Sequence, residues 1–233
     1  MRFDTDILTD LDLKDFFEDF ALFNPLNEAE QEKLISISRI ITTKKNKYIF
    51  KSKDPCKYLY FLIDGTVKIG TTSDDGREVI KSVIHPRAMF GEEAIFNQQS
   101  YKDFAKVISP SVTVLRIRMS EFREILNSNI GLNSNILDIL GNKLKKTEQR
   151  LESLIFNDAR TRIINFIKDN ANNFGRKVGF EMLLKHSLTQ QDIANYTGTS
   201  RQTVTSVLND LRKSNQIYFK RKSILIRDMA TLA

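Results

Sequence analysis

Residues Leu188–Tyr218 read LTQQDIANYTGTSRQTVTSVLNDLRKSNQIY, and this stretch decides the fold of the C-terminal third of the chain. Thr189 is placed to cap a helix over Gln190–Tyr196, and Gly198 stands where a tight turn needs a positive φ. Ser200 is placed to cap a second helix, whose apolar positions recur every three or four residues. These positions are Val204, Val207, Leu208 and Leu211. The spacing predicts a helix-turn-helix, a motif whose second helix enters the major groove of DNA.

Exposed side chains of the second helix and its flanks are the candidate DNA contacts. Arginine can pair with both acceptors of guanine and glutamine with the donor and acceptor of adenine, whereas hydroxyl groups suit phosphates. A basic tip between expected strands at 216–219 and 224–227 predicts a wing beside the DNA backbone. The alternative is a pair of ordinary amphipathic helices with a solvated hairpin. The candidate DNA-binding residues are Thr189, Gln191, Ser200, Arg201, Gln202, Thr203, Thr205, Ser206, Lys220, Arg221 and Lys222.

The positive charge of the chain is concentrated at its C-terminal end. Of the net charge of +7, all belongs to residues 156–233, which hold 13 basic and 6 acidic side chains. The first 155 residues hold 23 of each and are neutral overall. This asymmetry indicates that one module meets a polyanion and the other does not, although a solvated basic surface would have the same composition.

The N-terminal half contains two kinds of sequence pattern, one helical and one typical of strands. Residues 9–38 have a helical pattern, with Asn27 placed to cap a helix that begins at Glu28. Short β-branched and aromatic runs follow, and they predict an antiparallel roll or barrel. Asp64-Gly65 and Asp75-Gly76 separate the first three runs and are expected to form hairpin turns. The four runs are Tyr58–Ile63, Val67–Thr71, Glu78–Ile84 and Val112–Arg118.

A single long helix is predicted after the strands. Ser120 is expected to cap it, and the pattern, with Gly131 as its weakest point, continues to about Ile155, which is ~35 residues or ~50 Å. Its apolar positions alternate in steps of three and four, as in a coiled coil, so we predict a homodimer through this helix. The alternative is a long helix packed on its own domain. The seam consists of Leu137, Leu140, Leu144, Thr147, Leu151 and Leu154.

Several function classes find no support in the residues. The single cysteine, Cys56, excludes an internal disulfide and any multi-cysteine metal site. No apolar run is long enough to cross a membrane and no signal-peptide region is present, so a cytoplasmic location is the default expectation. The chain lacks the zinc-protease, Walker and nucleophile-elbow motifs. We therefore expect no enzyme, no metal and no cofactor.

Between the long helix and the helix-turn-helix, we expect a helix over 159–172 and a loop marked by Asn173, Gly175 and Gly179.

In this order of elements the chain resembles the Crp/Fnr (catabolite activator and fumarate-nitrate regulator) family, from about Asp19 onward. The stretch Phe90–Phe96, FGEEAIF, resembles the opening of that family's phosphate-binding cassette. The resemblance implies an α+β fold with three parts: a β-roll sensor of the cyclic-nucleotide-binding type at 1–118, a dimerisation helix at 119–156 and a winged helix-turn-helix at 157–233. It implies a bacterial transcription regulator that binds a near-palindromic promoter operator as a homodimer and contacts RNA polymerase.

The resemblance also supplies candidate ligand residues, which are Gly91, Glu92, Lys102, Asp103 and Thr147. Nucleotide-binding relatives hold the cyclic phosphate with an Arg-Ser pair where this chain has Lys102-Asp103. Lysine lacks the planar fork of arginine, and a carboxylate ~4 Å from an anion costs ~4 kcal/mol at an effective dielectric near 20. We expect no tight binding of cyclic AMP. A shifted alignment or an unknown small effector is the alternative.

Other sensor chemistries of the family also match poorly. Oxygen-sensing members use clustered cysteines for an iron–sulfur cluster, and haem-sensing members need an axial ligand. His85 precedes Pro86 and is expected to be a turn residue. Cys56 is either a structural loop residue or a redox switch whose thiolate is favoured by Lys53 and Lys57.

Overall fold

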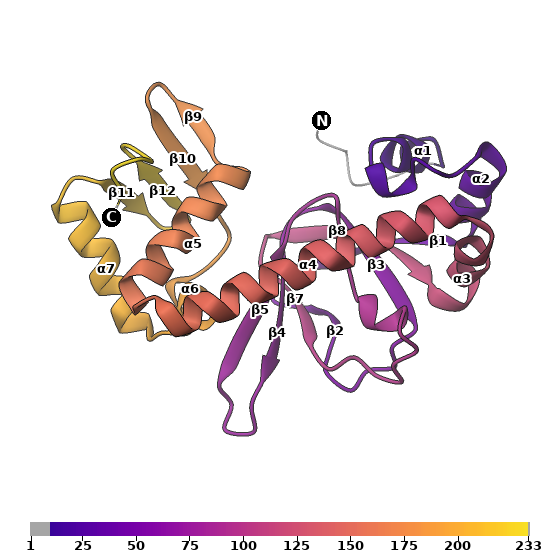
Figure 1. Cartoon of the computed structure of the whole chain (residues 1–233), viewed down its shortest axis with the longest axis horizontal. Coiled ribbons are helices and arrows are strands. Elements are labelled where there is room, and N and C mark those ends of the chain that lie inside the picture. The colour runs from indigo at the N-terminus through magenta and orange to yellow at the C-terminus, as the bar shows by residue number, and fades with distance from the viewer. Residues whose placement is uncertain (1–9, 233) are drawn as a thin grey trace. The chain divides into compact units, whose positions relative to one another are not determined.

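The computed structural model describes residues 10–232, and its backbone forms two compact units (Figure 1). Of the described residues, one unit comprises 10–71 and Lys81–Lys145, and the other comprises Thr72–Ile80 and 146–232. Residues 1–9, part of the segment in which no signal peptide is expected, lie outside the described residues.

The first unit begins with short helices whose start is set by local hydrogen bonds. They are α1 (Asp10–Glu18), the 3-10 helix η1 (Ala21–Phe23) and α2 (Glu28–Ile37). The predicted cap is confirmed: the Asn27 side chain accepts the Glu30 N–H at 2.9 Å, and the Glu30 carboxylate accepts the Asn27 N–H at 3.0 Å. This reciprocal pair satisfies two backbone donors that a helix start otherwise leaves open.

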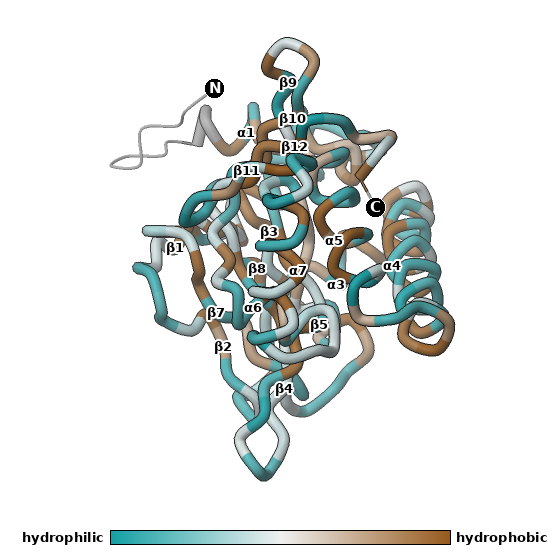
Figure 2. Tube along the Cα trace, turned by 90° about the vertical axis from the view of Figure 1, so that its left-hand side faces the viewer, coloured by the Kyte–Doolittle hydropathy of each residue, from teal (hydrophilic) through white to brown (hydrophobic). Residues whose placement is uncertain are grey.

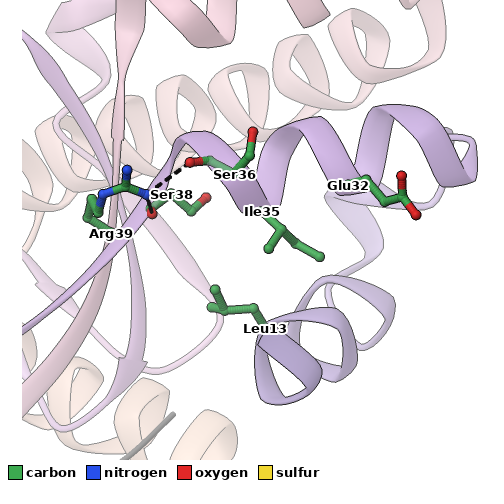
Figure 3. Close-up of a pocket in the computed structure, with 6 residues that line it drawn as sticks. All are labelled: Leu13, Glu32, Ile35, Ser36, Ser38 and Arg39. Atoms are coloured by element: carbon green, nitrogen blue, oxygen red, sulfur yellow. Dashed lines mark hydrogen bonds between the residues drawn. The ribbon is translucent and has the colours of Figure 1, made fainter. Parts of the chain in front are cut away.

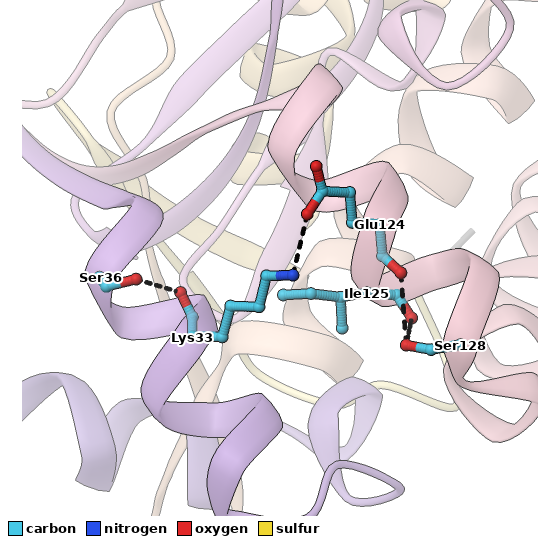
Figure 4. A network of polar contacts seen from close by, with 5 residues as sticks. All are labelled: Lys33, Ser36, Glu124, Ile125 and Ser128. Atoms are coloured by element: carbon cyan, nitrogen blue, oxygen red, sulfur yellow. Dashed lines mark hydrogen bonds and ion pairs between the residues drawn. The ribbon is translucent and has the colours of Figure 1, made fainter.

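The outer side of α2 carries a surface pocket and an ion pair. Leu13 and Ile35 line the pocket from α1 and α2 (Figure 3), and Arg39 donates to the carbonyl groups of Ser36 and Ser38 at 2.9 and 2.7 Å. Arg39 therefore satisfies carbonyl groups at the end of α2, as cations at helix ends commonly do. On another face, α2 is joined to the helix α3 (Met119–Ser128) by an ion pair of 2.9 Å between Lys33 and Glu124 (Figure 4).

Eight strands form two antiparallel four-stranded sheets. Their orders are β1-β8-β3-β6 and β2-β7-β4-β5. The strands are β1 (Ser38–Lys44), β2 (Tyr48–Phe50), β3 (Tyr58–Asp64), β4 (Val67–Thr72), β5 (Glu78–Ile84), β6 (Ala88–Phe90), β7 (Phe104–Val107) and β8 (Ser111–Arg118). All four predicted runs are strands within one residue at each end.

One sheet is buried on both faces, which explains its sequence pattern. Tyr60 and Leu62 of β3 join a core with residues of β2, β4 and β7, whereas Leu59 and Phe61 pack with the N-terminal helices. A strand covered on both faces reads as a continuous apolar run, as YLYFLI does here. Fully burying each large apolar side chain contributes about 1.5–3 kcal/mol.

One of the two Asp-Gly turns is a hairpin and the other is not. Asp75-Gly76 joins the neighbouring strands β4 and β5, as predicted. Asp64-Gly65 joins β3 and β4, which lie in different sheets, so the prediction of a hairpin there was wrong. Gly65 has a φ of +92°, and a Cβ atom on it would lie 2.5 Å from the carbonyl oxygen of Ser111. The dipeptide therefore forms a crossover packed against a distant turn.

The predicted long helix is divided in two, which corrects the expectation of one continuous helix. α3 ends at Ser128 and α4 (Ile130–Phe156) begins after Asn129, whose φ and ψ are −124° and 101°. Ser120 does not cap α3, because Arg118 holds the N-cap position without a side-chain bond. The 27 residues of α4 span about 40 Å, and its turns carry both hydrophilic and hydrophobic residues (Figure 2).

The second unit contains three further helices and one more sheet. The helices are α5 (Ala159–Phe174), α6 (Gln190–Thr197) and α7 (Arg201–Lys213). The sheet has the order β11-β12-β10-β9, and its strands are β9 (Arg176–Val178), β10 (Glu181–Lys185), β11 (Ile217–Lys220) and β12 (Ser223–Ile226). The loop expected around Gly175 and Gly179 is instead the hairpin β9–β10, which the polar composition of the segment concealed.

Candidate nucleic-acid interface and sensor pocket

The helix-turn-helix is built as its residues predict. Thr189 Oγ1 accepts the Asp192 N–H at 3.0 Å, and Asp192 accepts the Thr189 N–H at 2.8 Å. Gly198 adopts the left-handed conformation, with a φ of 66° and a ψ of 44°. Ser200 Oγ accepts the Thr203 N–H at 3.0 Å and so caps α7. Both caps and the turn residue are therefore confirmed.

Apolar contacts fix the second helix against the rest of its unit. Its buried stripe faces α5 and α6, and Ala194 is fully buried where α6 and α7 meet. The stripe consists of Val204, Val207, Leu208 and Leu211. Because the apolar stripe is turned inward, the opposite face of α7 is left to solvent.

That exposed face carries a surface depression that extends along α7 from Arg201 to Asn209. It is lined by Arg201, Gln202, Thr205, Ser206 and Asn209. Sequence reasoning missed Asn209, although its spacing of three and four residues from Ser206 and Thr205 places it on the same face. Five polar side chains thus converge at one place on this helix.

The polar side chains on this face differ in whether they already make hydrogen bonds within the chain. The Thr205 hydroxyl lies 2.8 Å from Gln190 Oε1 and 2.9 Å from the Arg201 carbonyl oxygen. Among residues 10–232, by contrast, Arg201, Gln202 and Ser206 have no side-chain hydrogen-bond or ion-pair partner. Their donors and acceptors remain available to a partner outside the chain.

The other candidate phosphate contacts are positioned by the caps. The hydroxyl groups of Ser200 and Thr203 lie 2.8 Å apart, and Thr189 Oγ1 lies 2.7 Å from Asp192 Oδ2. Gln191 Nε2 donates to Asn195 Oδ1 at 2.8 Å from an exposed position. These groups lie at the starts of α6 and α7, where backbone N–H groups favour anions.

Arg162 of α5 fixes the turn between the two helices. Its guanidinium donates to the carbonyl oxygens of Thr197 at 2.8 Å, Gly198 at 3.2 Å and Asn157 at 2.7 Å. A planar fork with several donors suits three carbonyl groups in fixed directions better than a single ammonium group does. The α6–α7 angle is therefore tied to α5 by hydrogen bonds as well as by apolar packing.

The wing is the two-residue turn between β11 and β12. Lys220, Arg221 and Lys222 are all exposed, and Lys222 has a φ of 68°. The Lys222 carbonyl accepts the His186 N–H at 3.0 Å, which joins the wing to the segment before α6. Burial lowers the pKa of His186, with a smaller contribution from the charge of Lys222. A neutral imidazole thus lies beside the cationic wing at neutral pH.

The cassette in the first unit contains internal ion pairs. Gly91 is left-handed with a φ of 78°, and a Cβ atom there would lie 2.9 Å from the Tyr60 ring. Glu92 is paired with Lys143 of α4. Asp103, only 8% exposed, is paired with Lys81 of β5 at 2.6 Å.

Burial and the charges of the cassette shift the pKa of Glu93, and two of the candidate ligand residues lie outside this charged cluster. Burial raises the pKa of Glu93, and the charges of Glu92 and Asp103 raise it further. Lys102 and Thr147 are exposed. The structure therefore brings Glu92 and Asp103 into one charged cluster with two lysines, neither of which was among the candidate residues.

Neither Cys56 nor His85 has the environment of a reactive sensor. Burial is the main reason that the pKa of Cys56 is raised to about 11, and Glu93 adds to the shift. The thiol is therefore protonated at neutral pH, contrary to the redox alternative. Burial lowers the pKa of His85 to about 4. Within residues 10–232 there is no group of three His, Cys, Asp or Glu side chains that could hold a metal ion, and no helix long and apolar enough to span a membrane.

Two family models match most of the chain. The cyclic nucleotide-binding domain matches residues 40–129, and the Crp-like helix-turn-helix domain matches residues 161–233. A CRP-like cAMP-activated global transcriptional regulator of Mycobacterium tuberculosis is 34% identical over 190 residues, which are 79% of this chain and 82% of that protein. The chain belongs to the Crp/Fnr family. It is a DNA-binding transcription regulator of that family, as the resemblance implied.

More distant relatives agree with this membership. The global nitrogen regulator of a Nostoc strain is 28% identical over 193 residues, covering 82% of this Crp/Fnr chain and 86% of the relative. The solved structure of FixK2 from Bradyrhizobium japonicum has a TM-score of 0.75 at 20% identity, covering 84% of this chain and 96% of that one. The fold predicted for this Crp/Fnr regulator is therefore confirmed.

Proposed function

We propose that this regulator binds a near-palindromic operator as a homodimer and reads base edges mainly with Arg201, Gln202 and Ser206. The observation that carries the proposal is the depression on α7, where these three side chains are exposed without internal partners. A helix placed in the major groove presents its N-terminal residues to the bases. Arg201 pairs best with guanine and Gln202 with adenine.

The remaining polar groups are assigned to positioning. Hydroxyl groups already engaged in caps, and the cations of the wing, fit phosphate oxygens, which set register without reading sequence. Thr205 is assigned both a structural and a DNA-contacting role, because its hydroxyl already bonds to Gln190 of α6. The groups assigned to phosphates are Thr189, Gln191, Ser200, Thr203, Lys220, Arg221 and Lys222.

The exposed seam of α4 supports the dimer. Leu137, Leu144, Leu151 and Leu154 are 68, 61, 59 and 45% exposed in the single chain. An apolar row of this length is unfavourable in water and matches the seam of a two-helix coiled coil. Two copies joined along α4 would present two recognition helices, expected one DNA turn or ~34 Å apart.

We assign residues 1–118 to sensing, 119–156 to dimerisation and 157–233 to DNA binding. The ion pairs in the cassette support a sensor that does not bind cyclic AMP tightly. Another small molecule is then the candidate effector. Contact with RNA polymerase and action in the cytoplasm, where promoters are transcribed, belong to the same proposal. We assign no reaction to the chain.

The test is operator selection with the full-length protein and Arg201→Ala. The variant should lose about 1–3 kcal/mol of operator binding and relax selection at one guanine. Arg176→Ala, which removes an exposed arginine of β9 in the same unit, is the matched control and should keep the preference. If Arg201→Ala selects the same bases as the unaltered protein, the assignment of the reading face is wrong.

A further inference from the structure

Two arginines of β8 flank one tyrosine ring of β3 in the first unit. The Cζ atom of Arg116 lies 4.5 Å from the centroid of the Tyr58 ring, and that of Arg118 lies 5.8 Å from it. Tyr58 is the register partner of Arg118, and Arg116 stands two residues earlier in the same strand, so all three side chains share one face of the sheet. We call Tyr58, Arg116 and Arg118 the arginine–tyrosine cluster.

The backbone of Tyr58 is fixed by a buried side chain. The hydroxyl group of Tyr101 donates to the Tyr58 carbonyl oxygen at 2.6 Å and accepts the Tyr58 N–H at 3.2 Å. Cation–π attraction holds the guanidinium groups beside the ring. A guanidinium group stacked on a ring keeps the N–H donors along its edge free, and this is how arginine commonly meets a phosphate or a carboxylate.

The side chain of Arg116 has no acceptor inside the protein. Within residues 10–232 it makes no hydrogen bond and no ion pair, and its Nε atom is buried without a partner. Buried donors in folded proteins are nearly always bonded, because an unbonded one lowers the stability of the folded state. The acceptor for Arg116 must therefore come from outside the chain.

Carboxylates of the protein do little to neutralise the cluster. Among residues 10–232, its one ion pair joins the Arg118 Nε to Glu121 at 3.8 Å, between side chains that are 54 and 47% exposed, so the pair is weak. Arg39 of β1, the register partner of Arg116, adds a third positive charge, although its own Nη1 already donates to two carbonyl groups. By contrast, the two lysines beside the cassette each face a carboxylate.

The surroundings favour a small anion over a protein partner. Protein–protein interfaces are built around apolar and aromatic anchors, but β1, β3 and β8 carry none of the exposed large apolar side chains of residues 10–232. Tyr58 and Arg116 are only partly exposed. A recessed ring with a guanidinium group beside it suits one phosphate or carboxylate group, whose oxygens can accept two parallel hydrogen bonds from arginine.

We propose that the arginine–tyrosine cluster binds the phosphate or carboxylate group of a small molecule. Arg116 donates to the oxygens of this group, Arg118 adds charge and further donors, and the Tyr58 ring orients both. The site uses none of the candidate ligand residues of the cassette. It is also independent of the proposed operator binding, because neither the α4 seam nor α7 takes part.

The experiment titrates the full-length protein with inorganic phosphate and, separately, with succinate, by calorimetry and by thermal unfolding. Sodium chloride at equal ionic strength is the reference, because multivalent anions also stabilise proteins in general. The variants are Arg116→Gln, Arg116→Lys and Arg118→Gln. The control is Arg87→Gln, which removes an exposed cation of the same unit that pairs with Asp19.

We expect saturable binding of at least one of the two anions to the unaltered protein, with a rise in Tm of several degrees at about one hundred times its Kd. Arg116→Gln should raise Kd about tenfold or more. Arg116→Lys keeps the charge but loses the planar fork, so it should recover only part of the affinity. Arg118→Gln should weaken binding less, and Arg87→Gln should leave Kd unchanged. The anion that binds more tightly identifies the group that the site takes.

The lysine variant and Arg118→Gln keep the test decisive if Arg116→Gln does not fold. The proposal fails if neither anion binds saturably to the unaltered protein. Equal Kd values for the unaltered protein and the variants of Arg116 and Arg118 would reveal a general salt effect and would also overturn it. Binding of a hexaglutamate peptide that depends on Arg116, without binding of either small anion, would assign the cluster to an acidic protein partner instead.

Discussion

The Lys81 ammonium group donates to the Asp103 carboxylate at 2.6 Å, in the cassette where nucleotide-binding relatives hold a cyclic phosphate. A buried carboxylate needs a cationic or hydrogen-bonding partner, and here the partner comes from β5, which belongs to the same sheet as β7 but does not pair with it. The cassette contains a second such pair, between Glu92 and Lys143. Two positive charges near the cassette, those of Lys81 and Lys143, are thus already paired with carboxylates of the protein, whereas Lys102 is exposed.

Cyclic AMP should therefore not stabilise the protein. A ligand at one hundred times its Kd adds about 2.7 kcal/mol, which for a chain of this size is several degrees at roughly 2–4 °C per kcal/mol. We expect no shift in Tm with millimolar cyclic AMP or cyclic GMP. A reproducible rise of several degrees would show that Lys102 and Asp103 tolerate the phosphate.

Removing Lys81 should destabilise the β-roll. Lys81→Ala leaves the Asp103 carboxylate, which is mostly buried, without its partner. The expected loss is about 1–3 kcal/mol, toward the lower end because half of the Lys81 side chain is exposed. Urea unfolding of the purified protein measures it. Lys102→Ala, at the exposed neighbour of Asp103, is the control and should stay within about 0.5 kcal/mol. Equal effects would contradict a specific role for the pair.

Arg162→Lys should weaken operator binding without changing base preference. Lysine keeps the charge but cannot donate to the carbonyl groups of Thr197, Gly198 and Asn157 together. We expect a loss of stability of about 1–2 kcal/mol in urea unfolding and uniformly lower affinity for matched and mismatched operators. Arg176→Lys, on exposed β9, should change neither quantity. A changed base preference would place Arg162 in the reading face.

Charges on the α4 seam should separate the dimer. Leu144→Glu combined with Leu151→Glu places two pairs of facing carboxylates in a two-helix interface. We expect a monomer by light scattering at micromolar concentration and loss of operator binding. Lys145→Glu, on the same helix but outside the seam, should remain dimeric. If the seam variant remains a dimer, the dimer interface does not lie on α4.

Some elements followed from local sequence because local atoms make them. The capping pairs Thr189–Asp192 and Asn27–Glu30 use residues three apart, and Gly198 itself adopts the left-handed conformation that the turn needs. The strand runs were also recognisable, since β-branched and aromatic side chains alternate with turn residues. Asn209 could have been included from helical spacing alone.

Other elements could not be predicted, because residues distant in sequence decide them. Asn129 interrupts the long helix while its side chain bonds to the carbonyl of Pro25 at 3.1 Å and to Glu30 at 2.8 Å. Near the break, a Cβ atom on Gly131 would lie 2.7 Å from Pro25. The periodicity continues through this point and Gly131 marks only a weak position of the helix, so the break itself follows from the tertiary contacts.

By itself, the sequence determined the helix-turn-helix, the polar face of its second helix, the apolar seam and the concentration of charge near the C-terminus. These depend on spacing and on side-chain chemistry within a few residues. Only the tertiary structure decided that Asp64-Gly65 crosses between sheets and that lysines 22 and 51 residues away in sequence neutralise Asp103 and Glu92. Each of these depends on strand order and on contacts between distant segments, which local periodicity does not encode.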